Sequence, residues 1–352
     1  MNKIAELYFI EGVRCGILDK ERFRRKRPEQ RRKDQKRKAG ERMFRYTVKR
    51  ILTGILSLFV LATVTFFLVR MIPGSPFQRG GVSSQVVEAV EQEYGLNEPL
   101  LMQYVTYMGG LLHGDLGISY EDPSTRVTEI IARAWPITAS IGITALAVSV
   151  ILGTSLGILM AFTKHRSVRR VISAGGMLAA GIPSFAAAIL LLLVFSVKLK
   201  WLPASGLLSP LHYVLPVTAL SLYPAAVISR LSGSALQAEM GKDYVLFARA
   251  KGMNRGRTIL THALKNAYLP VLNYVGPASA SLLTGSFVIE SIFTIPGLGR
   301  EFVGSITNRD YTLILGLTVF MGAVVIAVNL ITDLLCAWLD PATRRAYREE
   351  TL

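Results

Sequence analysis

Long apolar runs separated by shorter polar stretches dominate the sequence from residue 48 onward. Six of these runs approach the roughly 20 apolar residues that an α-helix needs to cross a bilayer. They are approximately Val48–Val69, Ile137–Thr163, Val171–Val197, Tyr213–Leu236, Tyr268–Ile292 and Thr312–Leu339. A hydrophobic content of 51% is high for a soluble protein of this length. The pattern therefore predicts an all-α membrane protein with six transmembrane helices.

Prolines interrupt the fourth and fifth runs, at Pro216 and Pro224 in one and at Pro270 and Pro277 in the other. Each proline removes a backbone donor, but neighbouring helices in a membrane can satisfy the freed groups. We therefore expect these two helices to be kinked and still to span. Small residues are frequent in the second and third runs, where they favour close packing between helices.

Charge is unevenly distributed along the chain, which carries 40 Lys and Arg against 24 Asp and Glu, for a net charge of +16. The basic residues cluster in residues 1–50, Lys164–Arg170, Lys242–Lys265 and Arg344–Arg348. Every cluster flanks an apolar run, as expected of charges that set membrane topology. We therefore interpret the basic balance as topological and expect no nucleic-acid partner.

The same charges predict an orientation. Residues 71–136 contain three basic side chains, Arg79, Arg126 and Arg133, against eight acidic ones: Glu88, Glu91, Glu93, Glu98, Asp115, Glu121, Asp122 and Glu129. Basic loops remain in the cytoplasm, so residues 71–136 are expected outside, with short helices of their own, for example Ser84–Tyr94. Both termini, Lys164–Arg170 and residues 237–267 are expected inside. Lys198 and Lys200, on the outer side, depart mildly from this rule.

Residues 1–42 are expected to form a separate cytoplasmic extension, ahead of a transmembrane domain at 43–347 and a short cytoplasmic tail at 348–352. The stretch Arg22–Arg42 is almost wholly polar or charged and cannot bury a core, which favours disorder. Two interpretations stay open. The basic run is attracted to anionic lipid beside the first span, or the functional protein begins at Met43.

Catalytic and metal-binding chemistry has little support in the sequence. The two cysteines, Cys15 and Cys336, lie far apart, and the four histidines are scattered at His113, His165, His212 and His262. No metal site or cofactor is expected from such a distribution. The sequence contains no G-x-x-x-x-G-K-S/T phosphate loop, so ATP hydrolysis would require a separate chain.

Residues 237–267 form a compact basic insert between the fourth and fifth runs. Asp243–Lys251 contains helix formers, Gly252 suits the left-handed turn that ends a helix, and Asn254 suits the N-cap of a second helix running toward Lys265. This pattern predicts a surface helix, a sharp turn and a helix returning to the membrane. The charges alone fit an ordinary cytoplasmic loop equally well.

The segment Ala248–Gly252, followed by His262–Ala267 and Leu269–Leu272, resembles the coupling signature of ABC importer permeases. More narrowly, the chain resembles the dipeptide/oligopeptide/nickel permease family over about Met43 to Tyr347, and is most similar to the first of the two permease subunits of such systems. Further matching segments are Tyr46–Arg50, Arg70–Pro76, Tyr94–Leu100, Gly114–Ser119, Gly285–Glu290, Ile295–Gly299, Asn308–Tyr311 and Asp340–Pro341. The sequence departs from the wider signature at Leu246, where a glutamate is usual, and residues 1–42 have no counterpart.

The resemblance implies a non-catalytic permease of the type I ABC importer fold in a prokaryotic plasma membrane. Its expected partners are a homologous second permease, two cytoplasmic ABC ATPases and an extracytoplasmic binding protein. The expected ATPase-coupling residues, carried by a cytoplasmic coupling helix, are Ala248, Arg249, Ala250, Lys251, Gly252 and Met253. ATP-driven closure of the ATPases would shift the permease between two conformations, because the ATP-bound dimer favours one of them.

Polar side chains within spans are candidates for the translocation path. We predict Ser286, Glu290, Asn329 and Asp333 for this role, the last two lying one turn apart on the last helix. For each there is an alternative: Glu290 at the outer interface, Asp333 at the inner one, and Asn329 as a bond between helices.

Three classes of function differ in what they would leave in the sequence: an importer driven by a separate ATPase, a secondary transporter and a membrane enzyme. Di- and oligopeptides are the expected cargo of the importer, and nickel, glutathione or another small solute is the alternative within the same machinery. A secondary transporter would show more charges within spans and inverted repeats. A membrane enzyme would show clustered acids, nucleophiles or metal ligands.

Overall fold

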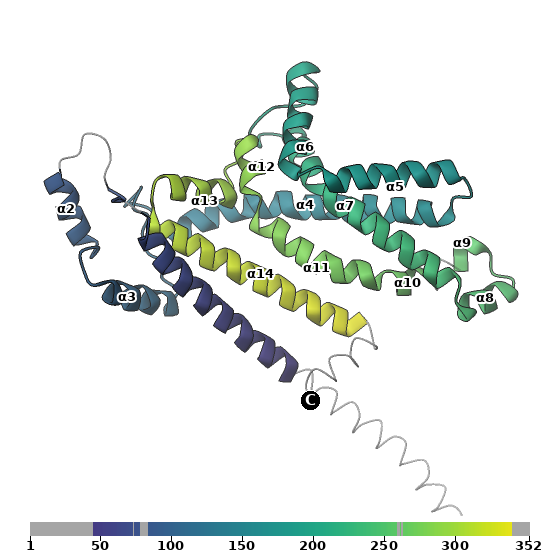
Figure 1. The fold of residues 1–352 in the computed structure, drawn as a ribbon, viewed down its shortest axis with the longest axis horizontal. Helices are drawn as coiled ribbons and strands as arrows, with labels where there is room; N and C mark the ends of the chain where they lie inside the picture. Colours follow the sequence, from purple (N-terminus) through teal and green to yellow (C-terminus); the bar gives the residue numbers. More distant parts are fainter. Residues whose placement is uncertain (1–44, 73, 78–83, 259–260, 262, 340–352) are drawn as a thin grey trace, which may run out of the picture. The chain divides into compact units, whose positions relative to one another are not determined.

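The structure is a computed structural model that describes residues 45–72, 74–77, 84–258, 261 and 263–339 (Figure 1). Over these ranges the chain is helical, and the only β-type pairing is an isolated bridge between Ile118 and Arg126. The extension at 1–42, the tail at 348–352, Pro73 and His262 fall outside the described residues. The elements below, apart from the start of the first helix, lie in one compact unit, Gly54–Pro341.

Five helices of the described residues are long and apolar enough to span a membrane. They are Arg45–Arg70, α4 (Val127–Phe162), α7 (Leu211–Met240), Leu269–Ile292 and α14 (Tyr311–Leu339). The fourth of these consists of α11 (Leu269–Thr284) and α12 (Phe287–Ile292), joined through Gly285. Pro216, Pro224 and Pro277 all lie inside helices. The prediction that proline-containing runs stay helical is therefore confirmed.

The third predicted span, Val171–Val197, is not one straight helix. It is divided into α5 (Arg166–Gly181) and α6 (Ser184–Leu191), and α6 continues as a π-helix, Leu192–Lys198. The chain bends by 103° between the two parts. Pro183 lacks an N–H, and it forces Ile182 into an extended conformation, φ −88° and ψ 121°. Counting this bent pair as one span gives the six that the sequence predicts.

Helix α4 also differs from its prediction, because it begins at Val127 rather than Ile137 and continues through Pro136. Its first turns are anchored by burial: Val127 and Ile131 pack with Leu298 and Leu317 in an apolar cluster. Tertiary packing therefore overrides the helix-breaking tendency of the proline. The sidedness of residues 71–136 stays a prediction.

Shorter helices occupy the connections. α2 (Ser84–Glu93) and α3 (Leu100–Leu112) precede α4, and α2 confirms the helix predicted at 84–94. α8 (Asp243–Ala250), α9 (Arg255–Thr258) and α10 (Leu264–Ala267) follow α7. α13 (Leu298–Thr307) lies between α12 and α14.

The centre of the unit is the pairing of α4 with α7, which lie side by side (Figure 1). Gly153 and Gly157 of α4 face α7 so closely that an added Cβ would overlap the carbonyl oxygens of Ala225 and Ser229 respectively. Glycine is required here by close approach, as in many membrane helix pairs. The pair gives a rigid scaffold from which α8 and the α11 side of the bundle extend.

Candidate functional site

The insert after α7 has the predicted helix–turn–helix geometry. α8 ends in a Schellman motif: the Gly252 N–H donates to the Arg249 carbonyl at 3.0 Å, and the Met253 N–H donates to the Ala248 carbonyl at 3.3 Å. Gly252 has φ 86°, a conformation that favours glycine. Asn254 Oδ1 then accepts from the Arg257 N–H at 2.8 Å and caps α9. Both local predictions, the glycine turn and the asparagine cap, are confirmed.

The two faces of α8 have opposite character. Val245 and Ala248 are buried, and Val245 packs with Leu236, Ala263 and Ala267. The other face is exposed and partly apolar, with Leu246 at 52% and Phe247 at 63% exposure. Such a surface, carried on a helix whose opposite face is anchored, is typical of a docking element.

The six predicted coupling residues divide between these faces. Arg249, Ala250, Lys251 and Gly252 are exposed, Met253 is half-buried, and Ala248 faces the interior of the chain. The Lys251 ammonium lies 4.6 Å from the centre of the Phe247 ring, so cation and apolar surface form one continuous patch. Contact of this patch with an ATPase stays a prediction. The sequence reasoning missed Phe247, although its spacing from Lys251 was a signal.

A polar cluster at the junction of α7 and α8 holds the insert. Glu239 accepts from Lys242 Nζ at 2.6 Å and from the Tyr244 hydroxyl at 2.5 Å, and Asn266 donates to the same hydroxyl at 3.2 Å. Burial, together with the hydrogen bond to Glu239, raises the pKa of Tyr244, and the bond to Glu239 raises the pKa of Lys242. The charges at this junction are thus matched within the chain.

A second candidate region is a cavity of about 620 Å³ that lies among the α5–α6 bend, α7 and the α11–α12 connection. Its polar lining is uncharged and includes Tyr223, Tyr274, Ser281 and Ser286. Of the four predicted path residues, Ser286 lines this cavity. Tyr223 and Tyr274 escaped the sequence reasoning because they are 51 positions apart and meet only through packing of α7 and α11.

Glu290 is placed differently, with only 3% of its surface exposed. Its carboxylate accepts from Thr138 Oγ1 at 3.0 Å, from the Gly299 N–H at 2.8 Å and from the Arg300 N–H at 3.3 Å. The last two are free donors of the first turn of α13, so Glu290 caps that helix from a neighbouring element. A role of Glu290 in the translocation path stays a prediction. In the structure its carboxylate caps α13.

Asn329 and Asp333 are half-buried on α14 and are not among the residues that line the cavity. Their part in the path also stays a prediction. Across the described ranges, no three His, Cys, Asp or Glu side chains come together in a group that could hold a metal.

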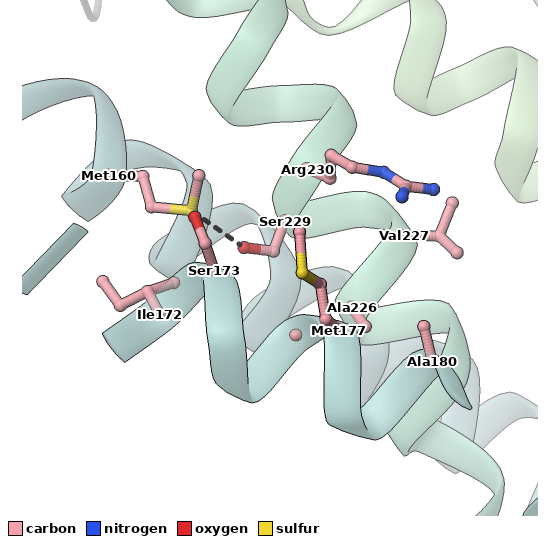
Figure 2. Close-up of a pocket in the computed structure, with 10 residues that line it drawn as sticks. Met160, Ile172, Ser173, Met177, Ala180, Ala226, Val227, Ser229 and Arg230 are labelled. Atoms are coloured by element: carbon pink, nitrogen blue, oxygen red, sulfur yellow. Dashed lines mark hydrogen bonds between the residues drawn. The ribbon is translucent and has the colours of Figure 1, made fainter. Parts of the chain in front are cut away.

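A smaller pocket of about 80 Å³ lies where α4, α5 and α7 meet (Figure 2). Met160, Ile172 and Met177 form its apolar wall, and Ser229 Oγ donates to Met160 Sδ at 3.9 Å. Arg230 borders it, but Figure 2 shows the guanidinium extending away from Met160 and Ile172, on the side where Val227 lies. A charged residue this far inside a span was visible in the sequence and was overlooked.

These features define a class of protein: a polytopic helical membrane protein with a solute-sized cavity among its spans and a short helix with an exposed, basic face at the end of one span. Comparison with known families then identifies it. The chain belongs to the inner membrane components of binding-protein-dependent transport systems, whose family model matches residues 153–345, with the N-terminal model of the same component matching residues 43–142. The family is one of membrane permease subunits.

The chain matches curated relatives over nearly their whole length. The chain is 40% identical over 300 residues to the dipeptide transport system permease DppB of Bacillus subtilis, which spans 85% of this chain and 97% of the relative. It is 39% identical over 305 residues to the oligopeptide transport system permease OppB of Escherichia coli K12, covering 86% and 100% respectively. Both relatives are named for the transport of peptides.

A solved structure confirms the fold. The MetNI methionine ABC transporter, in an inward-facing conformation, contains a chain that superimposes with a TM-score of 0.52 at 16% identity, covering 60% of this chain and 96% of that one. At this identity the likeness speaks for the type I ABC importer permease fold alone. The predicted fold class is thereby confirmed.

Proposed function

We propose that the chain is the membrane subunit of an ATP-driven peptide importer in a prokaryotic plasma membrane. With a homologous second permease it forms the path for di- and oligopeptides that an extracytoplasmic binding protein delivers. Two cytoplasmic ATPases drive the cycle through the insert after α7. Peptides are favoured over nickel or another small solute because the curated relatives described above are named for dipeptide and oligopeptide transport.

The observation that carries the coupling part of this proposal is the two-faced helix α8. On its inner face Val245 and Ala248 are buried, and Val245 packs with Leu236 of α7 and Ala267 of α10, so a force applied to α8 reaches both helices through direct packing. Its outer face presents Phe247, Arg249 and Lys251 to a partner. The fixed glycine turn at Gly252 gives this surface one shape rather than many.

The function is tested by reconstituting the purified chain with its second permease, its ATPases and its binding protein in vesicles. ATP-dependent accumulation of a labelled dipeptide is expected, and omission of this chain is expected to abolish it. Accumulation that needs an ion gradient and no ATPase would contradict the proposal and favour a secondary transporter. Accumulation of nickel or glutathione with no peptide uptake would contradict the cargo alone.

Orientation belongs to the same proposal: both termini and residues 237–267 inside, residues 71–136 outside. In a variant without native cysteines, Glu91→Cys or Glu121→Cys is expected to react with an impermeant thiol reagent in intact cells. Arg255→Cys is expected to react only after the cells are opened. The reverse pattern would contradict the proposed orientation.

A further inference from the structure

Arg230 is a charged residue in the interior of the span α7. The helix continues for ten residues beyond it to Met240, a distance of about 15 Å along the axis. The only acidic residue of α7 is Glu239, in its last turn, which is already bonded to Lys242 and Tyr244. An ionisable side chain at such a position is costly and marks a functional group by default.

Arg230 shares a helical face with the cavity. Tyr223, Val227 and Arg230 follow one another at spacings of four and three residues, which places them on one side of α7. Tyr223 is 50% exposed and lines the 620 Å³ cavity. This face of α7 thus leads from the exposed Tyr223 at the cavity, by the half-buried Val227, to the exposed Arg230.

No anion of the described chain neutralises this cation. The Arg230 side chain is exposed, and no hydrogen bond or ion pair joins it to a described residue. The elements that surround the cavity, α5, α6, α7, α11 and α12, contain only two carboxylates, Glu239 and Glu290. Glu239 is bonded at the α8 junction and Glu290 at the start of α13. The anion that neutralises Arg230 must therefore come from a group outside these five elements.

We propose that Arg230 binds the C-terminal carboxylate of the peptide as it passes along the path, an inference that rests on the proposed function. A free carboxylate is the one anionic group that all linear peptides share, whatever their side chains. The planar guanidinium matches it with two parallel hydrogen bonds. The uncharged hydroxyls of Tyr223, Tyr274 and Ser281 leave the rest of the cavity tolerant of different side chains.

A lipid headgroup also offers anionic oxygens, and the experiment separates the two sources. Cys15 and Cys336 are replaced, and Val227→Cys is introduced in the complete importer, reconstituted with the α8 side accessible. The rates of reaction with a sulfonate-bearing and a trimethylammonium-bearing methanethiosulfonate are compared. The two reagents differ mainly in the sign of their charge.

For an introduced thiol beside Arg230, the ratio of the anionic reagent's rate to the cationic reagent's rate is expected to be about tenfold higher than for an exposed control thiol. This preference comes from the field of a unit charge some 6 Å away in water. Adding Arg230→Gln is expected to remove this preference, and Arg230→Lys to retain most of it. Leu246→Cys on the exposed face of α8 is the control, whose ratio should not respond to Arg230→Gln.

Ligand specificity is measured in the same assay. A dipeptide with a free carboxylate is expected to slow the reaction at position 227 when Arg230 is present and not in Arg230→Gln, while its C-terminal amide has no effect in either. Slowing by phosphatidylglycerol in the bilayer, with no effect of the dipeptide, would assign Arg230 to lipid and overturn the proposal. A thiol inert to both reagents would also overturn it. If the importer fails to accumulate peptides in vesicles, the proposed function fails independently, because the charge preference does not require transport.

Discussion

The α12–α13 region and the α7–α8 junction each contain one well-bonded glutamate, and the two are surrounded very differently. Glu290 is 3% exposed, and its partners, Thr138 and the first turn of α13, belong to the interior of the bundle. Glu239 accepts a hydrogen bond from Lys242, whose side chain is 56% exposed. One region is closed by the chain itself, and the other ends in a surface that the chain leaves open.

Two glycines make the same contrast. Gly285 and Gly252 have nearly equal φ angles, 90° and 86°. A Cβ on Gly285 would overlap Glu290 Oε1 and Thr138 Cγ2, whereas a Cβ on Gly252 would meet no atom of this chain within 4 Å. The difference teaches that substitutions near Glu290 should act on folding, and substitutions near Gly252 on binding to a partner.

The largest expected effect on stability is that of Glu290→Ala. Removing the carboxylate leaves two N–H groups of α13 and the Thr138 hydroxyl without their acceptor in a buried place, which should cost about 3 kcal/mol. Thermal unfolding of the purified complex in detergent measures this. Glu290→Gln keeps an acceptor and should lose clearly less. Equal stability of wild type and Glu290→Ala would break the contrast between the two regions.

Alanine at the two glycines sharpens the comparison. Gly252→Ala should cost about 1 kcal/mol, from the backbone alone. Gly285→Ala bears the same backbone cost plus overpacking against Glu290 and Thr138, and should lose about 1 kcal/mol more. Unfolding of both variants, side by side, gives the difference. A greater loss of unfolding free energy in Gly252→Ala than in Gly285→Ala would contradict the open surroundings of Gly252.

Charge reversal on the exposed face of α8 should alter docking and leave folding intact. Arg249→Glu or Lys251→Glu is expected to weaken retention of the ATPases, and more so at low salt, where repulsion is less screened. Pull-down of the ATPases across a salt series is the measurement. A loss that grows with salt would show that the contact is not electrostatic.

The smallest effect is expected at Arg257, which is exposed beyond the turn and contributes its backbone N–H, not its side chain, to the Asn254 cap. Arg257→Ala should change ATPase retention by no more than about twofold, as for most surface substitutions. The variant therefore serves as the matched control for Arg249 and Lys251. A loss equal to theirs would extend the docking surface past the turn.

Local signals in the sequence were sufficient for part of this picture. The glycine turn at Gly252 and the cap at Asn254 depend on neighbouring residues, and both were predictable because each is specified by backbone chemistry alone. The apolar runs predicted the spans for the same reason. The bend at Pro183 carried a signal too, a Gly-Ile-Pro sequence, but the continuous apolar content on both sides concealed it.

Other features depend on contacts between distant parts of the chain and could not be predicted. Glu290 and Thr138 are separated by 152 positions, and nothing in either segment names the other as its partner. The burial of Ala248 is a second case: it lies on the same side of α8 as Val245, which packs in an apolar cluster with Leu236, although the small size of Ala248 suggested an outward contact. Tertiary packing decides which face a residue occupies, and the sequence pattern of an eight-residue helix is too short to show it.

The proposed coupling of this chain to its ATPases through the turn at Gly252 is tested most directly by Gly252→Asp. The complete importer carrying this variant is reconstituted in vesicles, and three quantities are measured: ATPase retention, substrate-stimulated ATP hydrolysis and peptide uptake. Because a Cβ at this position meets open space in the chain itself, the variant should insert and fold with a loss of only about 1–3 kcal/mol. Stimulated hydrolysis and uptake should both be abolished, while full uptake by the folded variant would contradict the assignment of the coupling element.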